Sequence, residues 1–359
     1  MGKLFQILLI LLKLPLAGLF WVAVSVRHAL YASKILRQHE VNIPVVCVGN
    51  LAVGGTGKTP HVQMLVQLLS SEGVKVAVLS RGYGRKSKGF LYVEKTSAAR
   101  SVGDEPLQIK RRFPEVTVAV CKDRVQGAKK IIADNSEVKA IILDDGFQHR
   151  RLKAGLSIVL TTYDNLATKD YMLPLGRLRD AASQLHRADM VVVTKCPQNL
   201  KPIDFNVLEK DLKIRPYQHL YFTTYAYGSA VHVATGEPAA ALGAKSVIAL
   251  AGVADPRPFF DLLKERYTTA QTLRFSDHHR FGARDVRQLE SAVQRHPDSV
   301  VMTTEKDAMR LADVAMSNEL KRKIYYQPID VQFLNNGQKS FTQKTLSYVR
   351  KNKRIGYLY

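Results

Sequence analysis

The stretch from Val45 to His61, VVCVGNLAVGGTGKTPH, constrains the fold more than any other part of the chain. A short apolar run enters a glycine-rich loop, and the loop leads through Lys58 and Thr59 into an amphipathic segment, which predicts strand, loop and helix. Backbone N–H groups of such a loop converge on one point, and the helix adds its positive end there. We therefore expect a phosphate-binding loop, in which Lys58 reaches the β and γ phosphates and the Thr59 hydroxyl is a ligand of Mg²⁺.

The loop departs once from the usual pattern G-x-x-x-x-G-K-[ST], because Ala52 stands at the first glycine position. The glycines that let the backbone approach phosphates are all present. A plain glycine-rich turn before a helix is the alternative, but the strand before it and the helix after it favour the phosphate loop. The residues expected to bind the nucleotide are Ala52, Val53, Gly54, Gly55, Thr56, Gly57, Lys58 and Thr59.

Apolar runs of strand length alternate with helical segments from Val45 to Thr194. This alternation predicts an α/β fold of the P-loop NTPase type, a mostly parallel sheet with helices on both faces, whose ligands lie at the carboxyl ends of the strands. A basic helix from about Leu178 is expected before the strand at Met190, and the pattern restarts at Ser246. We expect an apolar amino-terminal helix over residues 1–30, a phosphate-loop domain over 31–225, a smaller second α/β domain over 226–345 and a solvated basic tail over 346–359.

Paired carboxylates follow the strand in residues 141–149, IILDDGFQH. An aspartate at the carboxyl end of a neighbouring strand is the expected second half of a phosphate-loop site, where it helps hold Mg²⁺ opposite the loop threonine. Asp144 and Asp145 both qualify. Side chains alternate along a strand, so only one of them is expected to face the metal, unless the chain bends there.

A phosphate loop predicts a nucleotide but not a reaction. Transfer to an alcohol needs a base for the hydroxyl proton and cations for the phosphoryl charge. Candidate bases are Asp104 in the segment GDEP and the cluster Asp277-His278-His279, although Asp104 could simply cap a helix. The candidate cations are Arg81, Arg85, Arg124, Arg177 and Arg179.

The run from Leu4 to Val26 is the most apolar of the chain and about long enough to cross a bilayer. Lys13 and Pro15 interrupt it, and basic residues flank both ends, which suits insertion into one leaflet with the cations at anionic headgroups. A long core helix is the alternative. A nucleotide site directly downstream requires the rest of the chain to be cytosolic.

The formal net charge of +22 indicates a polyanionic partner, which could be nucleic acid, an anionic membrane surface or an acidic substrate. No nucleic-acid-binding module is recognisable, so no nucleic-acid partner is expected, and no protein partner is implied. A membrane-associated P-loop GTPase or transport ATPase remains open as an alternative function. The segment Thr194-Lys195-Cys196-Pro197 lacks the aspartate that usually reads guanine.

The combination of motifs resembles the tetraacyldisaccharide 4′-kinase family, the lipid A 4′-kinases of Gram-negative bacteria. The apolar amino terminus matches the family too, so the resemblance covers most of the chain. The matching segments, in order from residue 45 to about 310, are VGNLAVGGTGKTP, SRGYGR, VGDEP, KDR, LDDGFQHRRL, PLGRLRD, VVVTK, SDHHRF and TTEKDA.

The resemblance implies a kinase that moves the γ-phosphate of ATP, with Mg²⁺, onto the 4′-hydroxyl of a tetraacylated glucosamine disaccharide 1-phosphate. It also implies work at the cytoplasmic face of the inner membrane, on whose anionic surface an amino-terminal helix rests, and an active site between two α/β domains. Under this resemblance, closure of the domains would bring the dyad together only when both substrates are bound.

The resemblance also assigns residues. Asp104 matches the catalytic aspartate of the family and His278 the histidine that pairs with it as a dyad. The other expected catalytic or active-site residues are Lys58, Arg124, Gln148 and Arg179, and those on the metal side are Thr59, Asp144, Asp145 and Asp180. Asp180 stands where the family commonly has glutamate, which leaves its part in ordering Mg²⁺ open.

Overall fold

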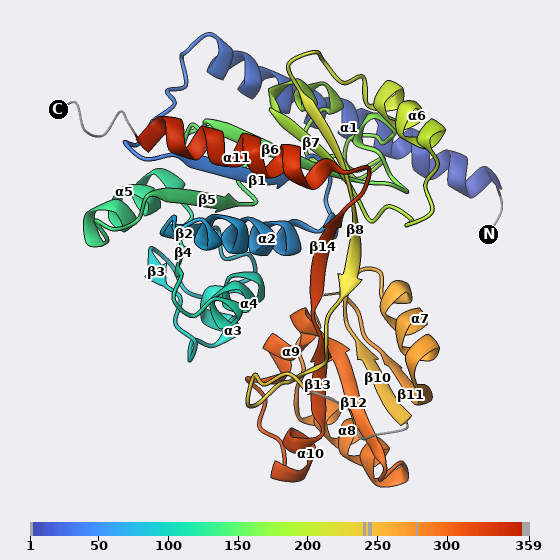
Figure 1. Cartoon of the computed structure of the whole chain (residues 1–359). Coiled ribbons are helices and arrows are strands. Elements are labelled where there is room, and N and C mark those ends of the chain that lie inside the picture. The colour runs from blue at the N-terminus through green and yellow to red at the C-terminus, as the bar shows by residue number, and fades with distance from the viewer. Residues whose placement is uncertain (1–2, 240–241, 243–245, 278, 354–359) are drawn as a thin grey trace.

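The computed structural model describes residues 3–239, 242, 246–277 and 279–353. Its larger sheet has nine strands in the order β14-β8-β7-β6-β1-β5-β2-β4-β3 (Figure 1). Neighbours from β8 to β4 run parallel, whereas β14 and β3 are antiparallel edge strands. The strands are β1 Val45–Asn50, β2 Val76–Ser80, β3 Leu91–Tyr92, β4 Thr117–Val120, β5 Ala140–Asp144, β6 Leu156–Thr162, β7 Met190–Thr194, β8 His219–Tyr227 and β14 Ile329–Phe333.

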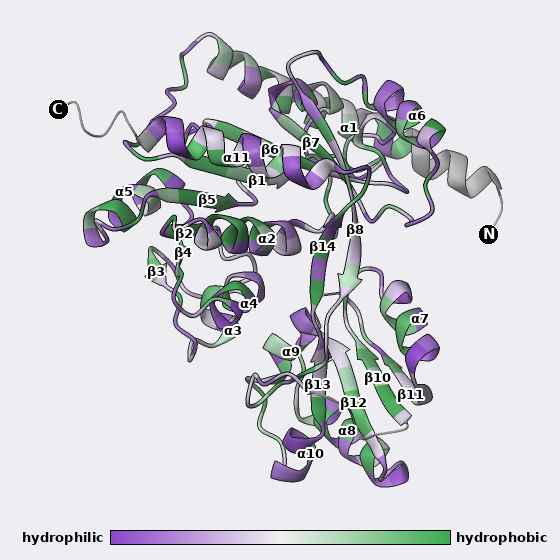
Figure 2. Cartoon of the chain, in the orientation of Figure 1, coloured by the Kyte–Doolittle hydropathy of each residue, from purple (hydrophilic) through white to green (hydrophobic). Residues whose placement is uncertain are grey.

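Helices cover both faces of this sheet, and β1 lies in its middle between β6 and β5. Apolar side chains of α2, α4 and α11 form a core on one face, and those of α5 and α6 form a core on the other. Figure 2 shows β1 and β5 coloured hydrophobic along most of their length, as strands buried on both faces require. The expected α/β architecture is confirmed. The helices are α2 Lys58–Ser71, α3 Ala99–Val102, α4 Asp104–Arg112, α5 Arg124–Asp134, α6 Pro202–Leu212 and α11 Gly337–Lys353.

The prediction of a basic helix from about Leu178 is wrong. The segment between β6 and β7 contains only two short 3-10 turns, Ala167–Lys169 and Ala182–Arg187. Leu178 is buried, and its backbone forms isolated β-bridges with Ala52 and Met172. This segment is therefore an irregular loop that packs against the phosphate loop.

A second sheet of five strands has the order β11-β10-β12-β13-β9 and is parallel except for β9. This confirms that the strand–helix pattern restarts near Ser246. Its strands are β9 Val231–His232, β10 Ser246–Ala251, β11 Thr268–Arg274, β12 Ser299–Thr304 and β13 Ile324–Gln327, and its helices are α7 Arg257–Arg266, α8 Ala283–Arg295, α9 Glu305–Leu311 and α10 Asn318–Arg322.

Strands β8 and β14 join the two sheets. They run side by side in opposite directions from one sheet toward the other (Figure 1), paired from Ile329 with Tyr227 to Phe333 with Thr223. The chain therefore enters the second domain along β8 and returns to the first along β14.

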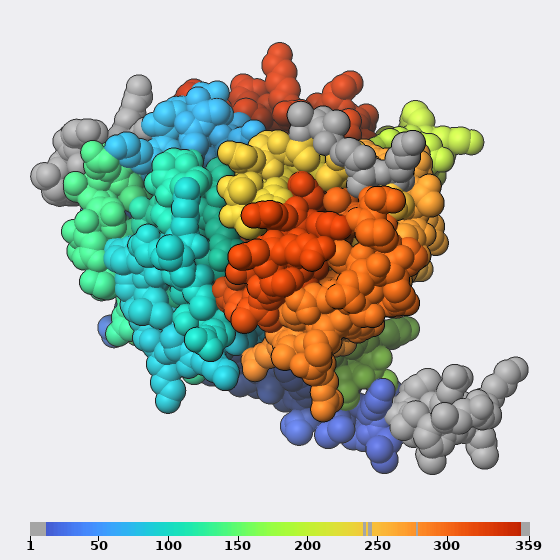
Figure 3. Space-filling view, turned by 90° about the horizontal axis from the view of Figure 1, so that it is seen from below, coloured from blue at the N-terminus to red at the C-terminus, as the bar shows by residue number. Residues whose placement is uncertain are grey.

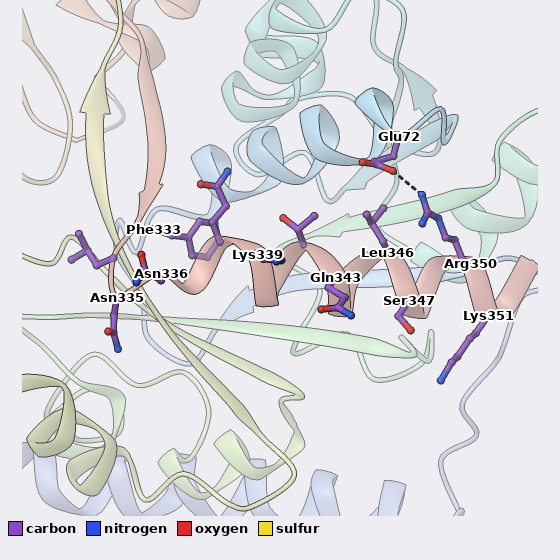
Figure 4. Close-up of a pocket in the computed structure, with 13 residues that line it drawn as sticks. Glu72, Phe333, Asn335, Asn336, Lys339, Gln343, Leu346, Ser347, Arg350 and Lys351 are labelled. Atoms are coloured by element: carbon purple, nitrogen blue, oxygen red, sulfur yellow. Dashed lines mark hydrogen bonds and ion pairs between the residues drawn. The ribbon is translucent and has the colours of Figure 1, made fainter. Parts of the chain in front are cut away.

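This return changes the expected boundaries, because β14 and α11 occupy the end of the range 226–345 and the start of the tail at 346. Helix α11 lies on the first domain, where Phe341, Leu346 and Val349 are buried in the same core as β1 and α2. Basic residues dominate the composition of α11, so the apolar face formed by these three side chains is not evident from the sequence. Figure 4 shows Arg350 of α11 paired with Glu72 beyond the end of α2, 2.7 Å apart.

A groove runs along the outer side of α11, between Phe333 and Lys351 (Figure 4). Its lining residues come from α11, from the end of β14 and the turn that follows it, and from Glu72, and none of them belongs to the phosphate loop. This groove is therefore separate from the nucleotide site that the sequence predicts.

The amino-terminal helix α1, Lys3–Ala32, has 30 residues and contains Pro15. Its part Leu12–Ala32 is long and apolar enough to cross a membrane, and only 11% of that window is buried inside the protein. The core-helix alternative is therefore wrong for this segment. The exposed apolar side chains of this part are Leu12, Leu14, Leu16, Leu19, Trp21, Val22 and Val26.

Replacement of Phe341 tests whether α11 is part of the first domain. Phe341 is 1% exposed and its ring packs on Tyr221 and Phe333 at centroid distances of 5.2 and 4.9 Å. We expect Phe341→Ala to lower the free energy of unfolding by about 3 to 5 kcal/mol, measured by urea denaturation. Gln343→Ala, at an exposed position of the same helix, should change it by less than about 0.5 kcal/mol. Equal, small effects at both positions would mean that α11 is a solvated tail.

Candidate active site

The phosphate loop follows β1 and has the backbone shape that its glycines allow. Gly54 and Gly57 have φ angles of 108° and 87°, in the region that favours glycine. A Cβ at Gly57 would lie 2.1 Å from the hydroxyl oxygen of Tyr225, so a larger residue does not fit there. A Cβ at Gly54 or Gly55 would meet no atom within 4 Å, which leaves the outer side of the loop open to a ligand.

Buried polar groups brace the loop from inside. The Thr56 hydroxyl accepts a hydrogen bond from Asn50 Nδ2 at 2.8 Å, and the Thr56 carbonyl accepts one from the Thr194 hydroxyl at 2.9 Å. Thr56 itself is 7% exposed. Its side chain therefore supports the loop and does not face the open side.

His61 holds the next turn. Its Nδ1–H donates to the Gly57 carbonyl at 2.8 Å, and its Nε2 accepts from the Thr223 hydroxyl of β8 at 3.1 Å. Burial lowers the pKa of His61 to about 4, although the hydrogen bond to Gly57 acts in the opposite direction. The ring is therefore neutral at pH 7 and ties the phosphate loop to the strand that leads into the second domain.

The two adjacent carboxylates at the end of β5 point to different surroundings, because Asp145 has a φ of 52° and bends the chain. Asp144 is completely buried, and its Oδ2 accepts from the Ser80 hydroxyl at 3.0 Å. Its Oδ1 is buried without a hydrogen-bond partner among the described residues. Burial, together with the charges of Glu105 and Asp145, raises the pKa of Asp144 to about 7. A buried, unpaired carboxylate oxygen is a suitable ligand for a cation.

Asp145 is instead paired with cations. Arg179 donates to it with both terminal nitrogens, Nη1 to Oδ2 at 2.9 Å, and Lys58 Nζ lies 3.7 Å from Oδ1. Burial alone would raise the pKa of Asp145, but the hydrogen bond from Arg179 and the charge of Lys58 outweigh it and hold the pKa below the usual value. Arg179 also donates to the side chain of Asn50, so it joins the two strand ends β1 and β5.

Of the other arginines expected to supply positive charge, Arg124 lies near the paired aspartates, whereas Arg85 and Arg177 make contacts within their own loops. Arg124 begins α5, is 4% exposed and has a buried Nε without a hydrogen-bond partner among the described residues. Gln148 donates to the Asn50 carbonyl at 2.7 Å and so lies at the same strand end. Arg85 donates to the Gly89 carbonyl at 2.5 Å and Arg177 pairs with Asp170 at 3.1 Å, which gives both a local structural contact.

Asp104 begins α4 and faces the second domain. Its Oδ1 accepts from the Glu105 backbone N–H at 3.0 Å, and its Oδ2 accepts from Arg310 Nε of α9 at 3.0 Å. Arg310 is held by Asp307, with Nη1 2.8 Å from Oδ1. Lys306, one turn before Arg310 on α9, pairs with Glu105 at 3.0 Å. Adjacent acids on α4 therefore meet cations spaced i and i+4 on α9, and Figure 3 shows the cyan surface of the first domain against the orange surface of the second.

Lys306 lies in the segment TTEKDA, on which the resemblance partly rests, and Arg310 lies just beyond it; the sequence assigns a role to neither residue. The i, i+4 spacing of these cations places them on one face of α9 but does not identify their partners. The expected partner of Asp104, His278, lies outside the described residues, so the dyad stays a prediction. The neighbouring His279 hydrogen-bonds to Asp285 at 3.0 Å within the second domain.

Asp180, expected on the metal side, has a different environment. Its Oδ1 accepts from His28 Nε2 of α1 at 2.7 Å, and Arg187 Nη1 lies 3.7 Å from Oδ2. Among the described residues, no hydrogen bond or ion pair joins its carboxylate to Thr59 or Asp144. The partners of Asp180 in the structure are therefore on α1 and on the segment before β7, and its part in ordering Mg²⁺ stays a prediction.

A central strand with a phosphate loop, beside a strand that ends in carboxylates, defines a P-loop nucleoside-triphosphate-binding enzyme. Comparison with protein families narrows this class. The family model described as tetraacyldisaccharide-1-P 4′-kinase matches residues 8–349, and this chain belongs to that family. The resemblance found in the sequence is confirmed, and the chain is an ATP-dependent kinase.

Relatives and a solved structure agree over nearly the full length. A tetraacyldisaccharide 4′-kinase of Bacteroides thetaiotaomicron is 41% identical over 355 residues, which cover 95% of this chain and 93% of the relative. The enzyme of the same name from Porphyromonas gingivalis is 40% identical over 347 residues, covering 94% and 97%. A crystal structure of Aquifex aeolicus LpxK in complex with ATP is 27% identical, with a TM-score of 0.75, and the match covers 94% of this chain and 98% of that one.

The neutral His61 predicts a dependence of stability on pH. An unfolded histidine takes up a proton near pH 6.5, whereas folded His61 does so only near 4. The unfolded state therefore binds more protons between these values, and the stability that His61 contributes is lost as the pH falls through this window. Between pH 7 and pH 5 we expect the wild-type protein to lose about 2 kcal/mol more unfolding free energy than His61→Gln, measured by urea denaturation. Parallel losses in both proteins would contradict a buried neutral ring.

Proposed function

We propose that this chain transfers the γ-phosphate of ATP to the 4′-hydroxyl of a tetraacylated glucosamine disaccharide 1-phosphate, at the cytoplasmic face of the inner membrane. Family membership supports the substrate class, since relatives at about 40% identity carry the name tetraacyldisaccharide 4′-kinase. The observation that carries the site is a phosphate loop open on its outer side, next to a strand end where Asp144 Oδ1 is buried without a hydrogen-bond partner among the described residues.

Lys58, Thr59 and Asp144 would hold ATP and Mg²⁺. They fit this pair because the loop is open on its outer side and Asp144 Oδ1 is buried without a hydrogen-bond partner among the described residues. When bound, Mg²⁺ neutralises charge on the phosphate oxygens. Asp145 is less suitable as a direct ligand, because Arg179 and Lys58 already balance its charge. Arg179 and Arg124 would supply further positive charge near the transferred group.

Asp104 would take the proton of the attacking hydroxyl. The Glu105 N–H donates to Asp104 Oδ1, and Arg310 donates to Oδ2 with both Nε and Nη2. Arg310 thereby keeps the carboxylate in one orientation, and a carboxylate is a group that can accept the hydroxyl proton. The charge of Glu105 acts on Asp144, which indicates that the start of α4 lies close to the end of β5. His278 would assist Asp104 as its dyad partner.

Two substitutions test the site from opposite sides. We expect Lys58→Ala and Asp104→Asn each to lower kcat for phosphorylation of the lipid disaccharide by at least about 100-fold, because one removes charge from the phosphates and the other removes the base. Labelled ATP and the purified disaccharide 1-phosphate in mixed micelles give the rate, and circular dichroism reports the fold.

The matched control is Lys129→Ala, which removes an exposed lysine of α5. It should keep the wild-type rate. A folded Asp104→Asn protein with near wild-type kcat would exclude Asp104 as the base. ATP hydrolysis as fast as phosphoryl transfer to the lipid would favour the P-loop ATPase alternative.

The membrane contact would be made by α1, whose apolar side chains are exposed over Leu12–Ala32. Trp21 is 52% exposed, and aromatic residues of this kind anchor helices at membrane interfaces. We expect Trp21→Ser to weaken binding to vesicles of phosphatidylethanolamine and phosphatidylglycerol by roughly tenfold in a flotation assay, because the variant has less apolar area to bury in the bilayer. Trp21→Phe should bind nearly as the wild type does. Unchanged flotation of Trp21→Ser would argue against contact through this face.

A further inference from the structure

The carboxyl-terminal turns of α1 hold a buried polar cluster that the membrane contact does not explain. His28 is 7% exposed, although its neighbours on the helix, Arg27 and Ala29, are exposed. His28 Nε2 lies 2.7 Å from Asp180 Oδ1, and Arg150 Nη1 lies 2.8 Å from His28 Nδ1. A guanidinium only donates, so Nδ1 is the acceptor and Nε2 carries the hydrogen that Asp180 accepts. The imidazole is thus held on both sides in one tautomer.

Further contacts join the same turns of α1 to the segment after the paired carboxylates. Arg27 Nη2 donates to the Gln148 carbonyl at 2.6 Å. The guanidinium of Arg150 lies over the ring of Tyr31, 4.8 Å from its centroid, and that of Arg27 lies 5.8 Å from the same ring. The end of α1 therefore contacts Gln148 and Arg150 through Arg27 and Tyr31, in addition to the contact of His28 with Asp180.

The contacts of α1 with Asp180 and with Gln148 both connect to the phosphate site through a few hydrogen bonds. Asp180 follows Arg179, which binds Asp145 and the side chain of Asn50. Gln148, whose carbonyl Arg27 holds, binds the Asn50 carbonyl with its own side chain. Asn50 in turn supports Thr56 of the phosphate loop. The two paths from α1 meet at the end of β1.

Burial makes the His28 contact consequential. Asp180 is 1% exposed; besides His28, its Oδ1 accepts from the Ala181 backbone N–H at 3.0 Å, and Arg187 Nη1 lies 3.7 Å from its Oδ2. Loss of the imidazole would leave a buried carboxylate with a long ion pair, and such a group moves or draws in water to recover partners. Because Asp180 adjoins Arg179 in the chain, that movement displaces the guanidinium that holds Asp145.

We propose that His28 is a positioning residue of the active site, so that the helix that meets the membrane also forms part of the wall behind the phosphate loop. It acts through Asp180 on Arg179. The inference rests on the proposed function, because its effect is read in phosphoryl transfer. It gives Asp180 a role in α1 docking and not in metal binding.

The test compares His28→Leu, which fills the space but makes neither hydrogen bond, with His28→Gln, whose amide can donate to Asp180 and accept from Arg150. Each is assayed as full-length enzyme with ATP and the lipid disaccharide 1-phosphate in mixed micelles. We expect His28→Leu to lower kcat by about 10- to 100-fold with little change in KM or in vesicle flotation, since misplacement of a catalytic group acts on the chemical step. His28→Gln should recover most of the loss. Ala29→Ser, at the exposed neighbouring position, is the matched control and should keep the wild-type kcat.

A second comparison separates docking from metal binding. The double variant His28→Leu with Asp180→Ala should lose no more activity than the more impaired single variant, because the two residues act as one unit. Asp180→Asn should keep most activity and the wild-type Mg²⁺ half-saturation, because its Oδ1 still accepts from His28. Multiplicative losses in the double variant, or a raised Mg²⁺ requirement in Asp180→Asn with wild-type behaviour in His28→Leu, would overturn the proposal.

The failures of the two proposals are distinguishable. A wild-type enzyme that does not phosphorylate the disaccharide contradicts the proposed function. A wild-type enzyme that does so, beside a folded His28→Leu protein of equal kcat, contradicts only the role of His28. A kcat loss that follows the melting temperature across His28→Leu and His28→Gln, without recovery in the latter, also overturns it.

Discussion

The balance of charge at the ends of β1 and β5 is the constraint on which the site depends. Asp144 and Asp145 are adjacent, buried or half-buried, and repel each other, so the fold must separate them and compensate them differently. The left-handed backbone at Asp145 separates them. Arg179 and Lys58 neutralise Asp145, and Asp144 keeps one oxygen without a described partner. A buried carboxylate oxygen held in this way has the chemistry of a cation ligand, which is the role proposed for Asp144.

The supports of this site come from three separate parts of the chain. The second domain reaches it through α9, where Lys306 and Arg310 pair with the adjacent acids at the start of α4. Strand β8 reaches it through Thr223 and His61, which hold the Gly57 carbonyl. Helix α1 reaches it through His28 and Asp180. Each support is a buried or part-buried hydrogen-bonded contact, and such contacts fix direction more strongly than apolar packing does.

The sequence was informative where neighbouring residues cooperate. The phosphate loop, the aspartates after β5 and the alternation of strands and helices are local patterns, and the structure and the family comparison agree with them. It was less informative where a helix is marked only by a few buried positions. The sequence predicts a basic tail at the end of α11, because its surface residues outnumber Phe341, Leu346 and Val349, which face the core. The helix expected at Leu178 failed because packing against the phosphate loop overrode a local preference for helix.

What the chain determined by itself was therefore its class of fold, its nucleotide loop and the family to which it belongs, because each depends on residues close together in the sequence. Only the tertiary structure decided which partner each charged residue takes. His28 and Asp180 are 152 positions apart, and Asp104 and Arg310 are 206 apart. Nothing in the spacing of such residues selects one arginine or histidine over another. The choice follows from which side chains the packed core leaves within hydrogen-bonding distance, and that distance exists only once the domains and α1 have come together.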